Sequence, residues 1–155
     1  MKAHVNPGWL LNRRAQESPR KTAVIYKDEK LDFLSLNQRA NRLARVLSER
    51  CREAVPKVGL LLPNRPEFVV AYLAVLKAGG VAIPLDVRLA RHEIAETLDW
   101  AGASCLLTLP STPLPALNGQ VALSLEGERI WVEGRAVDAP ATSMGGDREP
   151  GEEAA

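Results

Sequence analysis

The chain has 155 residues, of which 46% are hydrophobic and 25% are charged, an ordinary composition for a soluble globular domain with a sizeable core. Its 20 Lys and Arg residues nearly balance its 19 Asp and Glu residues, so no overall field attracts nucleic acid or an anionic membrane. No apolar run reaches the roughly 20 residues of a membrane-spanning helix, and the amino terminus lacks the apolar segment of a signal peptide. These features predict a small cytoplasmic protein with no nucleic-acid partner and no membrane span.

The two cysteines, Cys51 and Cys105, are far apart in the sequence. They form neither a metal-ligand pair nor a dense disulfide framework, which is typical of a reducing cytoplasm. Cys105 lies inside an apolar strand run, so we expect a buried, inert thiol. Cys51 follows Arg50 and precedes Arg52, which would lower a thiol pKa, but no general base is near it in the sequence.

The first third of the chain predicts a helix, a hairpin and a second helix. A helix begins after Asn6-Pro7, with Asn6 as its cap, and ends before Ser18-Pro19. Residues 22–26 and 31–33 are β-prone and flank a polar turn. Apolar residues at helical spacing over 36–47 then predict an amphipathic helix, for which Ser35 is the candidate cap.

Residues 58–109 carry unbroken apolar runs at 58–62, 81–85 and 105–109. Such runs suit strands that are covered on both faces, as in a parallel sheet. Helical segments over 66–78 and 90–101 separate them, and each helix ends at glycine. The order predicts an α/β fold, a βαβαβ parallel sheet with flanking helices plus small β-hairpins.

We therefore assign residues 1–109 to an N-terminal α/β subdomain. Residues 110–137 form a Pro-containing linker followed by a hairpin made from 121–125 and 129–132. Residues 138–155 are small, acidic and without periodicity, which predicts a disordered tail.

A search for a self-contained active site finds no catalytic residue and no metal-ligand set. The chain has neither the dinucleotide-binding glycine fingerprint nor a Gly-Lys-Ser/Thr phosphate loop. His92 lies on a predicted helix, where a solvated side chain is the usual case. The acids Glu93, Glu96 and Asp99 share one face of that helix, and a solvated stripe is the simplest interpretation.

Three arginines recur at every third residue of the amphipathic helix: Arg39, Arg42 and Arg45. A nucleic-acid site would interleave aromatic residues among them, and none are present in this stretch. A solvated helix face is the favoured interpretation, and contact with an acidic partner is the alternative.

Four ordered segments resemble the acyl-adenylate-forming (AMP-dependent synthetase/ligase) superfamily. They are Leu31-Asp-Phe-Leu-Ser-Leu36 with Arg39-Ala-Asn-Arg-Leu-Ala44, then Leu60-Leu-Leu-Pro-Asn64 with Pro66-Glu67, then Leu76-Lys-Ala-Gly-Gly-Val-Ala-Ile-Pro-Leu-Asp86, and Ala103-Ser-Cys-Leu-Leu-Thr108. The resemblance covers about residues 7–109. It implies the N-terminal subdomain of an AMP-forming ligase.

Within the superfamily the sequence is most similar to o-succinylbenzoate–CoA ligases of menaquinone biosynthesis. Asn6-Pro-Gly-Trp-Leu10 and Asp86-Val-Arg-Leu89 carry this likeness. It implies that Arg88 contacts a phosphate of CoA, whereas the simpler interpretation is that Arg88 pairs with a surface acid. Asp32 stands where the family usually has Thr or Ser.

The resemblance implies a full-length enzyme that uses ATP, Mg²⁺ and CoA to convert a small carboxylic acid first to an acyl-adenylate and then to a thioester. The Gly-rich phosphate loop and the carboxyl-terminal lysine of the family are absent from this chain, so we expect it to be inactive alone, with no cofactor of its own. Its partner would be the remainder of the ligase, in the same or a separate chain. Two alternatives remain: a non-catalytic interaction subunit of a split ligase, and a fragment of a peptide-synthetase adenylation domain.

Overall fold

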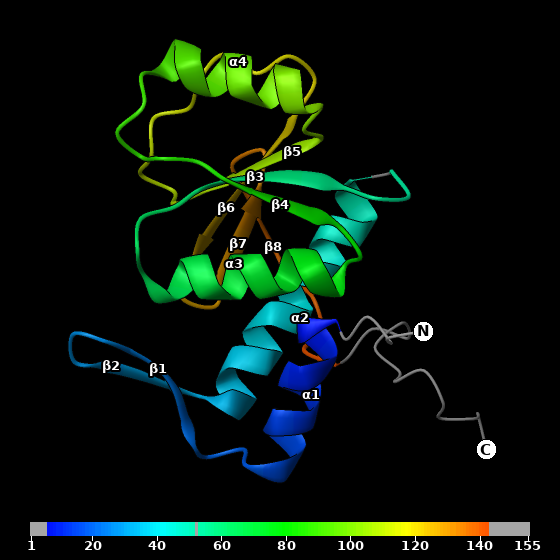
Figure 1. The fold of residues 1–155 in the computed structure, drawn as a ribbon, viewed down its shortest axis with the longest axis vertical. Helices are drawn as coiled ribbons and strands as arrows, with labels where there is room; N and C mark the ends of the chain where they lie inside the picture. The colour runs from blue at the N-terminus through cyan, green and yellow to red at the C-terminus, as the bar shows by residue number, and fades with distance from the viewer. Residues whose placement is uncertain (1–5, 52, 143–155) are drawn as a thin grey trace.

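The computed structural model describes residues 6–51 and 53–142, and Figure 1 shows their arrangement. The helices are α1 (Pro7–Glu17), α2 (Phe33–Arg50), α3 (Pro66–Lys77) and α4 (Arg91–Ala101). The strands are β1 (Thr22–Tyr26), β2 (Glu29–Asp32), β3 (Lys57–Leu61), β4 (Val81–Pro84), β5 (Cys105–Thr108), β6 (Val121–Glu126), β7 (Arg129–Val132) and β8 (Arg135–Val137).

Six of these strands form one mixed sheet in the order β4-β3-β5-β6-β7-β8. The strands β4, β3, β5 and β6 are parallel, and β7 and β8 add to the edge as antiparallel strands. The predicted βαβαβ unit and the α/β fold class are thereby confirmed. The sheet continues past Leu109, because β6 pairs with β5 and the predicted hairpin of β6 and β7 extends the same sheet.

The sheet lies between two helical layers (Figure 1). Helices α2 and α3 cover one face of the sheet, and α4 covers the other. Because alternate residues of a strand point to opposite faces, β3, β4 and β5 each contribute side chains to both apolar clusters. The four residues of β5 are all buried, as expected for a strand that is covered on both sides.

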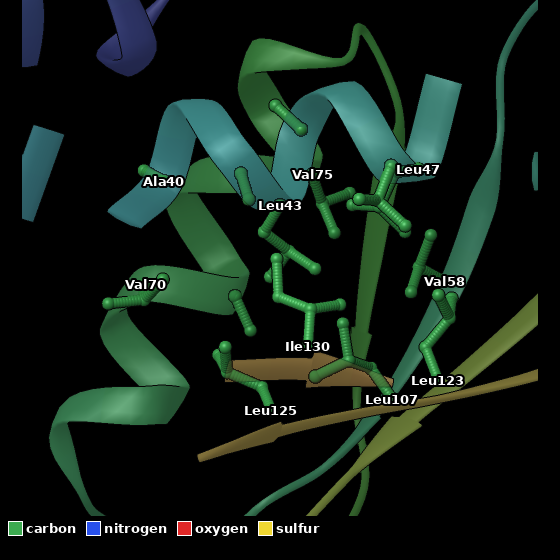
Figure 2. Close-up of a cluster of buried hydrophobic side chains, with 14 of the residues drawn as sticks. Ala40, Leu43, Leu47, Val58, Val70, Val75, Leu107, Leu123, Leu125 and Ile130 are labelled. Carbon is green, nitrogen blue, oxygen red and sulfur yellow. The ribbon is translucent and has the colours of Figure 1, made fainter. Parts of the chain in front are cut away.

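Most of the core lies on the face covered by α2 and α3. Figure 2 shows how Leu43 and Leu47 of α2 and Val75 of α3 meet Leu107 of β5 and Ile130 of β7. All five are at most 4% exposed, and complete burial of one such side chain contributes about 1.5–3 kcal/mol. The apolar residues that recur along α2 at helical spacing are those that pack into this cluster.

The first helix has the predicted start. The side chain of Asn6 accepts a hydrogen bond from the Gly8 N–H at 2.8 Å, and Pro7 occupies the first turn, where no N–H is needed. The predicted hairpin of β1 and β2 is also present, with Lys27 at a φ of 52° in its tight turn.

The predicted cap of α2 is wrong. Asp32, not Ser35, is the cap residue, and its Oδ1 accepts a hydrogen bond from the Ser35 N–H at 2.7 Å. Asp, Ser and Thr all cap helices through a side-chain oxygen. Asp32 therefore supplies the side-chain oxygen at which this helix begins.

Part of the predicted disordered tail has a defined place. Residues 138–142 run over α2, where Asn41 donates its Nδ2 hydrogen bond to the Ala141 carbonyl at 3.0 Å and Arg45 contacts Thr142. The rest of that predicted tail, residues 143–155, lies outside the described residues. Across the described ranges, no helix is both long and apolar enough to cross a membrane.

Candidate functional site

The carboxyl ends of β3, β4 and β5 meet at one edge of the sheet. The chain leaves β3 through α3 to reach β4 on one side, and then crosses through α4 to reach β5 on the other side of β3. The strand order therefore reverses at β3. In open α/β sheets, ligands bind outside the carboxyl ends of the strands at such a reversal, which makes this edge the candidate functional site.

A hollow of about 310 Å³ lies at this edge. Much of its wall comes from Leu61 at the end of β3, Pro63 and Leu89 in the loops after β3 and β4, and Leu109 after β5, and Ile94 of α4 also lines it. Among the described residues that line it, the polar side chains are those of Arg91 and Thr112. The hollow can therefore accept an apolar group, and its described lining contains no carboxylate, histidine or cysteine side chain.

Arg88 lies on the loop after β4, beside this hollow. Its guanidinium forms a forked pair with the carboxylate of Asp86, with 2.6 Å between Nη2 and Oδ2 and 3.0 Å between Nε and Oδ1. The Arg88 backbone N–H also donates to Asp86 Oδ1 at 2.9 Å. In this structure Arg88 therefore pairs with a surface acid, as the simpler interpretation has it, and that acid is Asp86 of the same loop.

This pair sets the local electrostatics. Hydrogen bonds from the Arg88 side chain, and next from its backbone N–H, lower the pKa of Asp86 from its ordinary 3.8 to about 2. The side-chain hydrogen bonds to Asp86, and next the negative charge of that carboxylate, raise the pKa of Arg88. The Arg88 side chain is 87% exposed, so a solvent-borne anion can approach the guanidinium without a change in the fold.

The predicted acids of α4 serve the fold. Glu93 accepts a hydrogen bond from the Ala90 N–H at 2.8 Å and so closes the first turn of the helix. Asp99 accepts one from Gln120 at 2.8 Å, which ties α4 to the segment before β6. Glu96 and His92 are exposed on α4, and neither is among the residues that line the hollow.

The arginine stripe of α2 is not a simple solvated face. Arg39 is only 16% exposed and lies between Glu29 of β2 at 3.5 Å and Glu128 of the β6–β7 turn at 4.0 Å. Arg42 also reaches Glu128, at 3.3 Å. The acidic groups that these arginines meet therefore belong to the same chain, and they hold two hairpins against α2.

The expectation of two unpaired cysteines is wrong. Cys51 and Cys105 form a disulfide, with 6.6 Å between their Cα atoms. The end of α2 and the start of β5 lie together in the fold, a proximity that sequence separation does not reveal. Cys105 is buried as predicted but is not a thiol, and the argument from the cysteines for a reducing cytoplasm no longer holds.

Glu67, which the sequence offered only as part of a segment that resembles the superfamily, is a buried acid near the site. It is 5% exposed, pairs with Arg65 at 3.3 Å, and accepts a hydrogen bond from the Gly127 N–H at 3.2 Å. It thereby joins the loop after β3 to the β6–β7 turn. Its sequence signal was the acid in the first turn of a helix that starts with Pro66.

The part of the chain that the structure describes contains no group of three or more His, Cys, Asp or Glu side chains that could hold a metal ion. A Mg²⁺ ion in an enzyme is commonly held by one or two carboxylates together with substrate phosphates and water, so it does not require a protein cluster of this kind. We derive no metal-dependent step from them.

Comparison with known proteins places this geometry in context. Residues 11–152 match the family described as AMP-binding enzyme. The chain is 34% identical to bacitracin synthase 3 of Bacillus licheniformis over 134 residues, which cover 86% of the chain and 2% of that protein.

Two solved structures carry the same fold. The nonribosomal peptide synthetase FmoA3, bound to α-methyl-L-serine-AMP, superposes with a TM-score of 0.71 at 28% identity, over 77% of this chain and 14% of that one. The o-succinylbenzoate coenzyme A synthetase of Bacillus subtilis, in complex with AMP, gives a TM-score of 0.62 at 33% identity, over 68% of this chain and 27% of that one. The chain thus spans only a small part of the length of the proteins that it matches.

Proposed function

Since the chain belongs to the AMP-binding enzyme family, we propose that it is the N-terminal part of an adenylate-forming enzyme that activates a carboxylic acid with ATP. The observation that carries this proposal is the family match over residues 11–152, which includes all six strands of the main sheet. The first reaction would join the acid to AMP and release pyrophosphate.

Amino-acid activation, as in a peptide-synthetase adenylation domain, is the better-supported form of this activity. Bacitracin synthase 3 and FmoA3 are both peptide synthetases, and FmoA3 has the higher TM-score of the two structures compared. The likeness to o-succinylbenzoate–CoA ligase is real at the level of the fold, but no feature of the described residues supports menaquinone biosynthesis in particular.

The chain's own contribution would be a scaffold with one open edge. It holds the loops after β3, β4 and β5 around an apolar hollow, and the loop after β4 also carries the exposed guanidinium of Arg88. The sequence has no glycine-rich phosphate loop, so the groups that cradle ATP would come from the remainder of the enzyme. We therefore propose that the 155-residue chain performs neither half-reaction alone.

An exchange assay tests this proposal. The chain, incubated with ATP, labelled pyrophosphate and either pooled amino acids or pooled aryl acids, should give no exchange. Addition of a peptide-synthetase adenylation domain that lacks its own corresponding segment should restore exchange with amino acids. Exchange by the chain alone would contradict the assigned division of labour. Failure of every complemented mixture to activate any acid would contradict the scaffold role.

Contact between Arg88 and a phosphate of CoA is a second candidate, and a specific observation favours it. Arg88 is exposed, fixed in charge and held at the carboxyl edge by a single acid, Asp86. A phosphate could replace that carboxylate as a forked partner, because both present two acceptor oxygens to a guanidinium. This candidate applies if the complete enzyme transfers its acyl group to CoA.

Calorimetric titration of the chain with CoA and with dephospho-CoA tests the contact. We expect CoA to bind more tightly than dephospho-CoA, and R88A to abolish the difference. R91A, which alters the neighbouring arginine that lines the hollow, is the control for a general loss of positive charge. Because the two ligands differ only in the 3′-phosphate, equal affinities of the wild-type chain would exclude contact of Arg88 with that phosphate, and an unchanged CoA affinity in R88A would exclude contact with the diphosphate as well.

An interaction subunit of a split ligase is compatible with the same scaffold. Its predicted sign is apolar surface that another part of the enzyme would cover. Val81 on the edge strand β4, Val87 after that strand and Trp100 on α4 are 46%, 50% and 90% exposed. Size-exclusion chromatography of the complemented mixture would separate stable assembly from transient contact.

A further inference from the structure

Cys51 and Cys105 join two elements that the sequence keeps 54 residues apart. Cys51 is the residue that ends α2, and Cys105 is the first residue of β5. The segment between them contains β3, α3, β4 and α4. The disulfide therefore closes a covalent loop around most of the parallel βαβαβ unit.

The surroundings of the two sulfurs accept either oxidation state. Cys51 is 3% exposed and Cys105 is fully buried, and both belong to the apolar cluster between α2, α3 and the sheet. A free thiol packs as a small apolar side chain. Reduction of the bond would consequently leave two thiols in a compatible environment, without a buried charge.

We propose that Cys51–Cys105 is a redox-responsive link that sets the stability of this α/β unit. A bond across a loop of this size restricts the unfolded chain, so the oxidised form should resist unfolding more than the reduced form. Cys105 lies at the start of β5, whereas the hollow and Arg88 lie at the carboxyl edge. The link therefore acts on stability and leaves the candidate site intact.

Thiol–disulfide exchange begins at Cys51. This residue terminates a helix and is followed by the exposed residues 53–55, whereas Cys105 pairs with β3 on one side and β6 on the other. The last turn of a helix opens more readily than a central strand. The Sγ of Cys51 is thus the atom that an external thiolate reaches first.

The chemistry balances with a small dithiol as reductant. Its thiolate attacks Cys51 Sγ, the Sγ–Sγ bond breaks, and the released Cys105 thiolate takes up a proton. The second thiol of the reagent then attacks the mixed disulfide and releases Cys51 as a thiolate, which is protonated in turn. The protein gains two electrons and two protons, and the dithiol becomes a cyclic disulfide. A small-molecule disulfide reverses the process.

Thiol counting and thermal unfolding of the 155-residue chain test the link. After air oxidation, alkylation in urea should add no mass, and after treatment with dithiothreitol it should add two alkyl groups. Reduction should lower Tm by roughly 10 °C, from the loop-closure entropy and the usual dependence of Tm on stability. Two free thiols in the oxidised sample, or the same Tm in both states, would overturn the proposal.

Two sets of variants sharpen the result. The double variant C51A/C105A should show a Tm that no longer responds to dithiothreitol. If this variant fails to fold, the thiol count and the Tm of the wild-type chain still test the proposal. In the native single variants, Cys51 of C105A should react with iodoacetamide at least tenfold faster than Cys105 of C51A. Equal rates, or a faster Cys105, would contradict entry through Cys51.

Discussion

The two faces of the sheet differ in what they carry. The face under α2 and α3 holds the larger apolar cluster, the disulfide and the ion pairs that tie two hairpins to α2. The face under α4 holds a small cluster around Leu98, and its margin opens into the hollow at the carboxyl edge. One layer is therefore built for stability, and the other is thin enough to leave room for a ligand.

The difference teaches why the candidate site lies where it does. A single helix covers only part of a sheet face, so the loops after β3, β4 and β5 on that side enclose space rather than a packed core. Loops at a strand-order reversal carry function because the rigid strands beneath them fix their ends.

The largest effect should come from truncation on the α2–α3 face. Leu43→Ala removes a fully buried side chain that lies between helix and sheet, and it should destabilise the chain by about 3–5 kcal/mol. Leu98→Ala, the matched variant on α4, should cost about 2–3 kcal/mol, because a lone helix can shift to close the space. Urea denaturation of both variants measures the difference, and equal losses would show that the two layers are equally rigid.

A second prediction concerns the closeness of α4 to the sheet. A Cβ added at Gly59 of β3 would come within 2.5 Å of Leu98 Cδ2, so Gly59→Ala should cost about 1–3 kcal/mol by overpacking.

The double variant Gly59→Ala/Leu98→Ala supplies the control. Leu98→Ala removes the atom that the new methyl group meets, so the double variant should lose less stability than the sum of the two single variants. Strict additivity in urea denaturation would mean that the cost of Gly59→Ala does not come from contact with Leu98, and Leu106 and Leu85, the next nearest side chains, would then account for it.

Much of this architecture could be predicted from local sequence patterns alone. The unbroken apolar runs indicated β3, β4 and β5, and glycine marked the end of α4, where Gly102 adopts a φ of 64°. Burial on both faces holds for β3 and β5, whereas β4 lies at the edge of the sheet and is only partly buried. Each of these signals lies within a short stretch of consecutive residues, so it can be detected in a single sequence.

The features that could not be predicted depend on tertiary proximity. The pairing of Cys51 with Cys105, and of Arg42 with Glu128, joins residues that only the folded sheet brings together. The hollow has the same origin, because three loops from separate strands form it. The cap of α2 was missed for a different reason: Asp32 and Ser35 are both good caps, and the hairpin decides which one begins the helix.

A smaller effect is expected from the ion pair that holds the β6–β7 turn to α2. Arg42→Ala should cost roughly 0.5 kcal/mol, because Glu128 is largely exposed and its attraction is screened by solvent. Thermal unfolding in low salt and in about 0.5 M salt measures this, and the difference between wild type and variant should shrink as the Debye length falls. A loss above about 2 kcal/mol would place this pair among the determinants of the core instead.

The smallest effect on stability should come from the equivalent pair at the open edge, Asp86 with Arg88. Its two side chains are 43% and 87% exposed, so the measurable quantity is the pKa of the carboxyl group. Because the folded pKa of Asp86 is about 2, below its ordinary 3.8, the stabilisation that the pair gives is present above pH 4 and is lost as the pH falls from about 4 to about 2. An NMR titration of the Asp86 carboxyl carbon should follow this, with R88A returning the pKa toward 3.8. An unchanged midpoint in R88A would assign the low pKa to the loop backbone, and Arg88 would then be free for another partner even in the absence of ligand.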